Sequence, residues 1–312
     1  MSTRLTKSEI RQDYIQEKYV IIAPKRGKRP HDVIKARDYH KPLSICVLCP
    51  ESLKNTKALY KIGRVEKWSL KVIANKFPAV SKTNKKAYGQ QEVVVETPDH
   101  TKEIEDLSTK QIADLLTAYQ VRTKEISLDK KIEYILIFKN DGGVAGASLQ
   151  HSHSQIFATE FLPPHLLDKS KRQQEYTLEH GTCVYCDVIK NESKGPRLIW
   201  QDKNMIAFCP YASMFNYEVW IVPKKHQDNI TDLSKEAKLS MAKILKHILT
   251  KISQLDLPYN FYFHQLINDD DQHLYLKVVP RGSVWAGVEI GSGLIINPIP
   301  PEEAAEFYRK GL

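Results

Sequence analysis

The chain has 312 residues and a formal net charge of +9, which allows one large domain or two ordinary ones, each with its own core. No run of about 18 apolar residues is present, and the polar first residues lack an apolar secretory segment, so we expect a cytoplasmic protein with no membrane partner. The positive charge permits an anionic partner. No recognisable nucleic-acid-binding motif accompanies it, so we expect no nucleic acid as a partner.

In the first half, apolar and β-branched runs predict strands at residues 19–23, 70–74, 92–96, 132–138 and 156–157. A long helix is expected between the third and fourth of these strands. Apolar residues recur there at helical spacing from Ile112 to Ile126, and Ser108 is a suitable N-cap. The glycine-rich run 142–146 predicts a flexible turn before the last strand.

The second half repeats this order, with strands expected at residues 217–222, 259–263 and 274–279 and a helix at 235–255. Such an order favours an α+β fold of two tandem repeats, each a mostly antiparallel sheet with one long helix. We place the boundary in the polar stretch 168–181, which gives halves of residues 1–172 and 173–312. Neither a G-x-G-x-x-G motif after a strand nor a P-loop is present, so neither common nucleotide cradle is expected.

A shared pattern of cysteines and histidines supports the repeat. Each half has a C-x-x-C pair followed by two histidines: Cys46, Cys49, His100 and His151 in the first, and Cys183, Cys186, His226 and His273 in the second. In each half the tripeptide Asp-Leu-Ser begins six residues after the first of these histidines. The chain therefore contains the same unit twice.

Alignment of the two units shows where they differ. Glu92 and Glu218 each lie eight residues before a candidate ligand, and the pairs Asn140-Asp141 and Asn268-Asp269 close similar apolar segments. His153 is matched by Tyr275, and Gln155 by Lys277. Both units keep four potential metal ligands, whereas only the first has a further histidine, His153, two residues after its last ligand. The residues that bind metal are therefore separable from the residue that reacts.

Both ligand sets predict Zn²⁺ sites. Zinc favours four-coordinate sites of Cys and His, and C-x-x-C supplies two thiolates from one tight turn. Cysteines stay reduced in the cytosol, where this motif more often marks a metal than a disulfide. A set of four protein ligands is closed to substrate, so we expect structural sites. The alternative for the second set is a relic whose reduced cysteines bind no metal.

His153 is the candidate nucleophile. Alternate residues of a strand face the same side, so His151, His153 and Gln155 project together. A neutral imidazole attacks phosphorus to give a covalent phosphoramidate. Gln155 is able to donate a hydrogen bond to a phosphoryl oxygen, and the glycine-rich turn with Ser148 offers further N–H and O–H donors. The alternative is that His151 and His153 bind one metal together with a further histidine.

Several longer motifs surround this centre. They are the run 19–24 followed by Arg26 and Arg29, Asn75-Lys-Phe77-Pro-Ala79, the run 89–100, Asn140, Gly146-Ala-Ser148, His151-Ser-His153-Ser-Gln155, and the segment 286–298 around Glu289. With these motifs the chain resembles the galactose-1-phosphate uridylyltransferase family, within the histidine-triad superfamily. The resemblance covers nearly the whole chain.

The resemblance implies a ping-pong reaction in which UDP-glucose gives uridylyl to His153 and galactose 1-phosphate then accepts it. It implies that Gln155 steadies the intermediate. It also assigns substrate contacts: Asn75 and Phe77 to uridine, Arg26, Arg29, Asn140 and Ser148 to phosphates, and Glu289 to hexose hydroxyls. Family members commonly form homodimers with sites near the interface, so a homodimer is expected.

The departures from the family pattern define an alternative. The best-known uridylyltransferases have Pro and Gly where this chain has Ser152 and Ser154, and many relatives carry His near Gln91. The Ser-bearing motif with two C-x-x-C pairs also resembles zinc-containing ADP-glucose phosphorylases, which would use His153 to transfer adenylyl to phosphate. A third hypothesis is a non-enzymatic zinc-ribbon protein that binds nucleic acid through its basic surface.

Overall fold

The computed structural model describes residues 5–28, 46–64, 67–267, 269 and 271–311. Within this part of the chain, one sheet has ten strands in the order β3-β4-β5-β7-β6-β11-β12-β10-β9-β8, and all its neighbouring strands are antiparallel. The strands are β3 (Tyr60–Gly63), β4 (Trp68–Ala74), β5 (Gly89–Val95), β6 (Tyr134–Asp141), β7 (His153–Thr159), β8 (Leu198–Gln201), β9 (Met205–Phe208), β10 (Val219–Pro223), β11 (Tyr259–His264) and β12 (Tyr275–Pro280). A smaller sheet joins β1 (Glu9–Gln12), β2 (Tyr19–Ile22) and β13 (Ile295–Asn297).

The order of the large sheet confirms the predicted repeat. Read outward from its centre, the first half runs β6-β7-β5-β4-β3 and the second runs β11-β12-β10-β9-β8, which is the same arrangement. The halves meet along β6 and β11, which pair from Asp141 with Tyr259 to Phe138 with Tyr262. The pair Phe138–Tyr262 is the central one if the metal ligands His151 and His273 are equivalent. Phe138 also pairs with Gln155, and Tyr262 with Lys277, so the predicted match of Gln155 with Lys277 is confirmed.

The strand register corrects two of the predicted matches. Glu92 pairs with Ile156 and Val219 pairs with Val278, so Glu218 occupies the position of Gln91 and not that of Glu92. Counting along β6 and β11 from the central pair places His264 at the position of Asn140. Asn268 lies outside the described residues.

The helices are α1 (Thr109–Ile126), α2 (Pro164–His180), α3 (Val184–Glu192), α4 (Lys235–Gln254), α5 (Gly287–Ser292) and α6 (Pro301–Arg309), with 3-10 turns at Pro24–Lys28, Ile104–Asp106, Gly143–Ala145 and Ile230–Asp232. The two long predicted helices are α1 and α4. Their N-caps are Ser108 and Ser234, each of which accepts a hydrogen bond from a first-turn N–H. This places the two Asp-Leu-Ser tripeptides at equivalent points of the halves.

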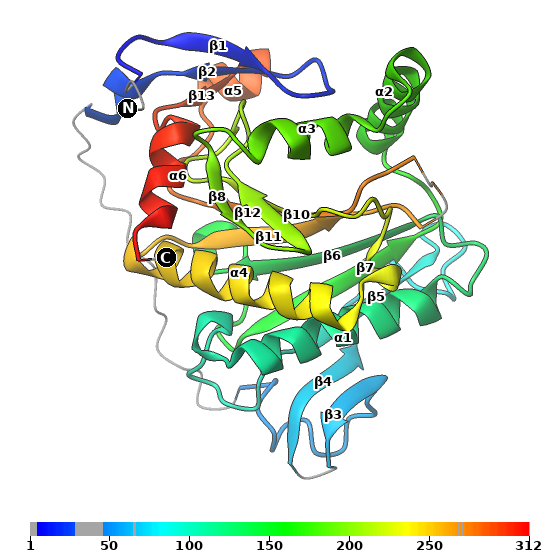
Figure 1. Ribbon diagram of the computed structural model, residues 1–312. Coiled ribbons are helices and arrows are strands. Elements are labelled where there is room, and N and C mark those ends of the chain that lie inside the picture. Colours follow the sequence, from blue (N-terminus) through cyan, green and yellow to red (C-terminus); the bar gives the residue numbers. More distant parts are fainter. Residues whose placement is uncertain (1–4, 29–45, 65–66, 268, 270, 312) are drawn as a thin grey trace.

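Helices α1 and α4 lie side by side across one face of the sheet (Figure 1). Their apolar sides, from Ile112 to Ile126 and from Met241 to Ile252, pack on the strands in the main core. The opposite face is covered unequally. Over the second half, Val184 and Tyr185 of α3 pack on Phe208 and Trp220. Over the first half, the described residues that pack there are the C-x-x-C loop, through Leu48 and Leu53 against β4 and β5, and Leu166 of α2 against Tyr134 of β6.

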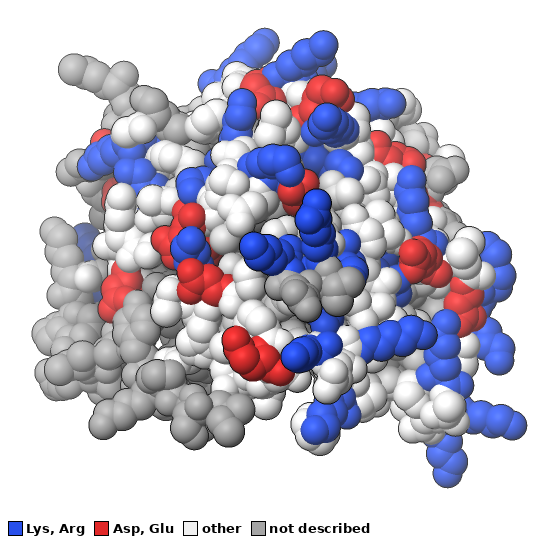
Figure 2. Space-filling model, turned by 90° about the horizontal axis from the view of Figure 1, so that it is seen from below, with Lys and Arg blue, Asp and Glu red and all other residues white. Residues whose placement is uncertain are grey.

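The expected α+β class is confirmed, with both halves in one continuous antiparallel sheet. The predicted boundary between residues 172 and 173 lies inside α2, and we propose α2 as the connection between the halves. Among the described residues, no helix is long and apolar enough to cross a membrane. Figure 2 shows Lys and Arg side chains spread over the face seen from below, in keeping with the net charge of +9.

Candidate active site and metal clusters

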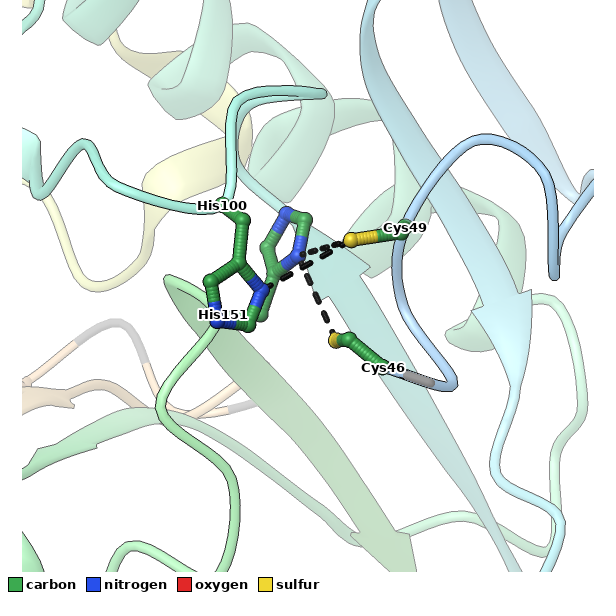
Figure 3. A group of neighbouring side chains, drawn as sticks. All are labelled: Cys46, Cys49, His100 and His151. Carbon is green, nitrogen blue, oxygen red and sulfur yellow. Dashed lines mark hydrogen bonds between the residues drawn. The ribbon is translucent and has the colours of Figure 1, made fainter. Parts of the chain in front are cut away.

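The first predicted ligand set comes together beside the start of β7. Cys46 and Cys49 lie on their loop, His100 follows β5 and His151 precedes β7, and the four side chains point toward one another (Figure 3). Their ligand atoms all lie within 4.8 Å of one another. The His151 Nδ1 atom is 3.6 Å from each sulfur, and His100 Nδ1 is 3.6 Å from the Cys49 Sγ.

These distances fit a tetrahedral metal. With metal–sulfur bonds of about 2.3 Å and metal–nitrogen bonds of about 2.05 Å, the sulfur–nitrogen edge of a tetrahedron is about 3.6 Å. The far nitrogen of His151, Nε2, donates to the Thr97 carbonyl at 2.8 Å. A carbonyl accepts only, so Nε2 carries the hydrogen and Nδ1 presents its lone pair to the centre of the cluster.

The second predicted set forms an equivalent cluster of Cys183, Cys186, His226 and His273. The Cys186 sulfur is 3.5 Å from the Nδ1 atom of His226 and 3.8 Å from that of His273. The His273 Nε2 atom donates to the Pro223 carbonyl at 2.9 Å, as His151 does to Thr97. Both clusters therefore have the donors and the outer hydrogen bond of a metal site.

His153 begins β7, two residues from the metal cluster, and 7% of its surface is exposed. Its Nδ1 atom donates to the His151 carbonyl at 2.8 Å. The hydrogen is thus on Nδ1, and Nε2 keeps a lone pair available for attack. Burial, and then the positive charge of Lys139, lower the pKa of the imidazole and favour its neutral form.

A buried ionic network lies directly behind the nucleophile. The Lys139 ammonium, 1% exposed, donates to Glu96 at 2.8 Å and to the Ser152 hydroxyl at 2.9 Å, and it is 3.3 Å from Glu103. Ser152 also lies 2.7 Å from a carboxylate oxygen of both glutamates. The network holds the peptide between the metal ligand and the nucleophile. Sequence reasoning overlooked Lys139, although a lysine inside an apolar strand signals a buried charge pair.

Gln155 lies on the same side of β7 as His153, because alternate strand residues share a face. Its Oε1 atom accepts a hydrogen bond from the Gln91 side chain at 2.9 Å. Phe77, 84% exposed, and Asn75 lie on the loop after β4, whose Ala79 N–H donates to Gln91 at 3.0 Å. The structure thus brings the predicted nucleoside residues close to Gln155.

Asn140 lies at the end of β6, beside the turn 142–146. Asn260 donates to its Oδ1 atom at 2.8 Å and thereby fixes its amide. Ser148 is exposed just after this turn. The N–H groups of residues 145–147 donate to carbonyls inside the turn, so the expected N–H donors to phosphate are narrowed to the rest of the turn and stay a prediction.

Arg26 and Glu289 lie elsewhere in the molecule. Arg26 is in the turn after β2, and Glu289 is on α5, where its carboxylate accepts from the Ala286 N–H at 2.9 Å. The Arg26 charge contributes to lowering the pKa of Glu289, after hydrogen bonds from backbone N–H groups, so these two residues share a surface. Within the described residues, no hydrogen bond joins either of them to His153 or Gln155. Arg29 lies outside the described residues.

The second half lacks this chemistry. Tyr275, at the position of His153, is buried and stacks on Trp220 at 4.5 Å. Lys169 of α2 donates to its hydroxyl at 2.5 Å. Lys277, at the position of Gln155, forms a buried ion pair with Glu218 at 2.7 Å. In the second half, Lys169 of α2 and Tyr185 of α3 therefore cover the residue at the position of the nucleophile.

Comparison with known proteins decides the family. Residues 2–163 match the N-terminal domain of galactose-1-phosphate uridyl transferase, and residues 169–278 match its C-terminal domain. The chain belongs to this family. It is therefore an enzyme of the nucleotidyltransferase and phosphorylase group, which excludes the non-enzymatic zinc-ribbon hypothesis.

Two curated relatives have different names. The chain is 31% identical to an ADP-glucose phosphorylase of Arabidopsis thaliana, over 97% of this chain and 92% of the relative. It is 30% identical to a galactose-1-phosphate uridylyltransferase of Thermotoga maritima, over 97% and 98% of the two chains.

Similar solved structures also include both a phosphorylase and a uridylyltransferase. The ADP-glucose phosphorylase of Arabidopsis thaliana with bound ADP-glucose aligns with a TM-score of 0.87 at 30% identity, over 98% of this chain and 100% of that one. A uridylyltransferase structure aligns with a TM-score of 0.75 at 28% identity, over 96% and 97%. Family and fold agree between these relatives, whereas their nucleotides differ.

Proposed function

We propose that the chain is a UDP-glucose–hexose-1-phosphate uridylyltransferase that works through a uridylyl-histidine intermediate on His153. The observation that carries the proposal is the hydrogen bond from His153 Nδ1 to the His151 carbonyl. It leaves Nε2 with a lone pair for attack, on the face of the sheet opposite α1 and α4. It also provides an acceptor that stabilises the imidazolium formed when Nε2 is phosphorylated.

The reaction would proceed in two displacements. Nε2 of His153 attacks the α-phosphorus of UDP-glucose, a nitrogen–phosphorus bond forms, and the bond to glucose 1-phosphate breaks. A phosphate oxygen of galactose 1-phosphate then attacks the same phosphorus and restores the neutral histidine. The Gln155 amide would donate to the phosphoryl oxygen in both steps.

The two Cys/His clusters would hold Zn²⁺ as structural ions. Each set supplies four ligands and leaves no position for a substrate. In the first half, Cys46, Cys49 and His100 would fix His151, and through it the carbonyl that orients His153.

The remaining substrate contacts follow from placement. Asn75 and Phe77 would bind the nucleoside, while Asn140 and Ser148 would bind phosphate near His153. Arg26 and Glu289 share a separate surface. A homodimer that placed this surface of one subunit over the His153 face of the other would bring the hexose phosphate to the nucleophile. Arg29 stays a proposed phosphate contact.

An adenylyl-transferring ADP-glucose phosphorylase is the second candidate. The relative of that name is 31% identical over 97% of this chain, and its structure aligns with a TM-score of 0.87. In that reaction inorganic phosphate would replace galactose 1-phosphate as the acceptor, and His153 would have the same role.

Intact-protein mass spectrometry after separate incubations with UDP-glucose and ADP-glucose tests both candidates. A uridylyl adduct that galactose 1-phosphate discharges is expected, and an adenylyl adduct discharged by inorganic phosphate would support the second candidate instead. The His153→Ala protein should acquire neither adduct while keeping its metal. Labelling of that variant, or no labelling of the wild type, would refute the mechanism.

A further inference from the structure

We infer that Gln91 is a positioning residue that fixes which end of the Gln155 amide faces the reacting phosphate. The inference rests on the proposed nucleotidyl transfer through His153 and Gln155. Gln91 lies on β5, where it pairs with Phe157, while Val93 of the same strand pairs with Gln155. Gln91 and Gln155 are therefore diagonal neighbours on one face of the sheet.

The orientation follows from one backbone donor. The Ala79 N–H lies 3.0 Å from the Gln91 side chain, and an N–H can only donate. The acceptor must be the Gln91 oxygen, so the Gln91 NH₂ group points the other way. It donates to the Gln155 side chain at 2.9 Å, which must therefore present its own oxygen to Gln91.

The Gln155 NH₂ group is then the end of the amide that remains for the phosphate. The oxygen and nitrogen of an amide have nearly the same size, so packing alone does not select between them. Only the NH₂ end stabilises the negative charge of a phosphoryl oxygen, while the oxygen end repels it. The chain Ala79–Gln91–Gln155 thus sets the polarity of the catalytic amide.

The same chain connects Gln155 to the proposed nucleoside loop. Besides the Ala79 contact, the Asn75 N–H donates to the Gln91 carbonyl at 2.9 Å, so Gln91 contacts both ends of the segment 75–79. In the second half, Glu218 occupies the position of Gln91 and pairs with Lys277 at 2.7 Å. Both halves therefore have a polar pair at equivalent positions. The pair is neutral in the first half, Gln91 with Gln155, and ionic in the second, Glu218 with Lys277.

Three substitutions of Gln91 are expected to reverse, preserve or randomise the orientation of the Gln155 amide. In Gln91→Glu the carboxylate accepts only, so it attracts the Gln155 NH₂ group and turns the Gln155 oxygen toward the phosphate. In Gln91→His a neutral imidazole accepts from Ala79 with one nitrogen and donates to Gln155 with the other. Gln91→Leu makes neither bond and lets the amide adopt both orientations.

The test is the single-turnover rate of nucleotidylation of His153, followed by rapid-quench mass spectrometry at saturating nucleotide sugar. Whichever of UDP-glucose and ADP-glucose labels the wild type is used. The rate should fall roughly 100-fold in Gln91→Glu, as for loss of an oxyanion donor, and less than about 10-fold in Gln91→Leu. Gln91→His should stay within about 3-fold of the wild type. Bound metal and the melting temperature should not change.

A double-mutant cycle separates amide orientation from the added charge. In a Gln155→Leu background, Gln91→Glu should slow labelling by less than about 3-fold, because no amide remains to be reversed. An equal cost in both backgrounds, or wild-type labelling by Gln91→Glu, would overturn the inference and leave the proposed function intact. No labelling of the wild type by either sugar would refute the proposed function itself.

Discussion

Replacement of Lys139 by methionine should destabilise the protein strongly. The Lys139 ammonium is 1% exposed and lies 2.8 Å from Glu96, which is fully buried. Burial alone would lower its pKa, but the carboxylates of Glu96, Glu103 and Asp141 outweigh burial and hold the pKa well above its usual range. Lys139→Met keeps most of the side-chain volume and removes only the charge, so it leaves a carboxylate buried without its cation.

The expected cost is about 3–5 kcal/mol in the free energy of unfolding, the range for breaking a buried ion pair on one side. For a chain of this size, each kcal/mol lowers the melting temperature by roughly 2 °C, so a decrease of about 6–10 °C is expected. Glu96→Gln in the same protein turns the unpaired carboxylate into a neutral amide. The double variant should therefore be more stable than Lys139→Met alone.

Differential scanning calorimetry at pH 7.5 measures these differences. Lys110→Met is the matched control, because the Lys110 side chain is 82% exposed and forms only a surface pair with Asp114. Its effect should stay below about 0.5 kcal/mol. If Lys139→Met melts within about 1 °C of the wild type, or if Glu96→Gln destabilises it further, the unpaired charge is not the cause and the reasoning fails.

Three other changes test separate features. Burial raises the pKa of Glu105 to about 7, so the folded chain keeps a proton that the unfolded chain loses above its ordinary pKa of 4.5, and stability falls as pH rises between these values. Glu105→Gln should therefore raise the melting temperature at pH 8 but not at pH 5, and equal effects at both would contradict this. Cys46→Ser should reduce metal content, measured by plasma mass spectrometry, from two ions per chain to one; unchanged content would exclude the first cluster as a metal site. Tyr275→His gives the second half a histidine at the position of His153, beneath Lys169 of α2. Labelling should still stop at one nucleotide per chain, because α2 blocks access to that position. A second adduct would show that it does not.

The repeat and its metal clusters were predictable because they rest on residue types with few alternative uses. Two C-x-x-C pairs with histidines at matching intervals already specified which eight side chains would meet. The two long helices were predictable from apolar spacing and serine caps. Most short strands were not: β1, β3, β8 and β9 have four residues each, too few for a period to emerge. The strand β2, of the same length, was predicted because it is an unbroken apolar run that ends at a proline.

The polar partners of the site depend on register, which intervals along the sequence do not determine. Counting back from the metal ligands makes Glu92 the equivalent of Glu218. The strand register instead makes Gln91 the equivalent of Glu218. The carbonyls that accept from the ligand histidines are those of Thr97 and Pro223, which agrees with the count from the ligands. The first half must therefore contain one more residue than the second between its strand and Thr97.

That extra residue falls where the first half places Glu96, the partner of Lys139. Counted from the central strand pair, the second-half counterpart of Lys139 is Phe263, and the counterpart of Ser152 is Leu274. Both are fully buried apolar residues. The second half thus has apolar residues at both of these positions, and its own buried pair, Lys277–Glu218, lies at the positions of Gln155 and Gln91. The junction of strand and metal cluster therefore does not require a charge at the Lys139 position. A buried ion pair costs desolvation that an apolar pair avoids. The Lys139–Glu96 pair is therefore explained by orientation of the peptide that holds His153, because Lys139 also donates to Ser152 of that peptide.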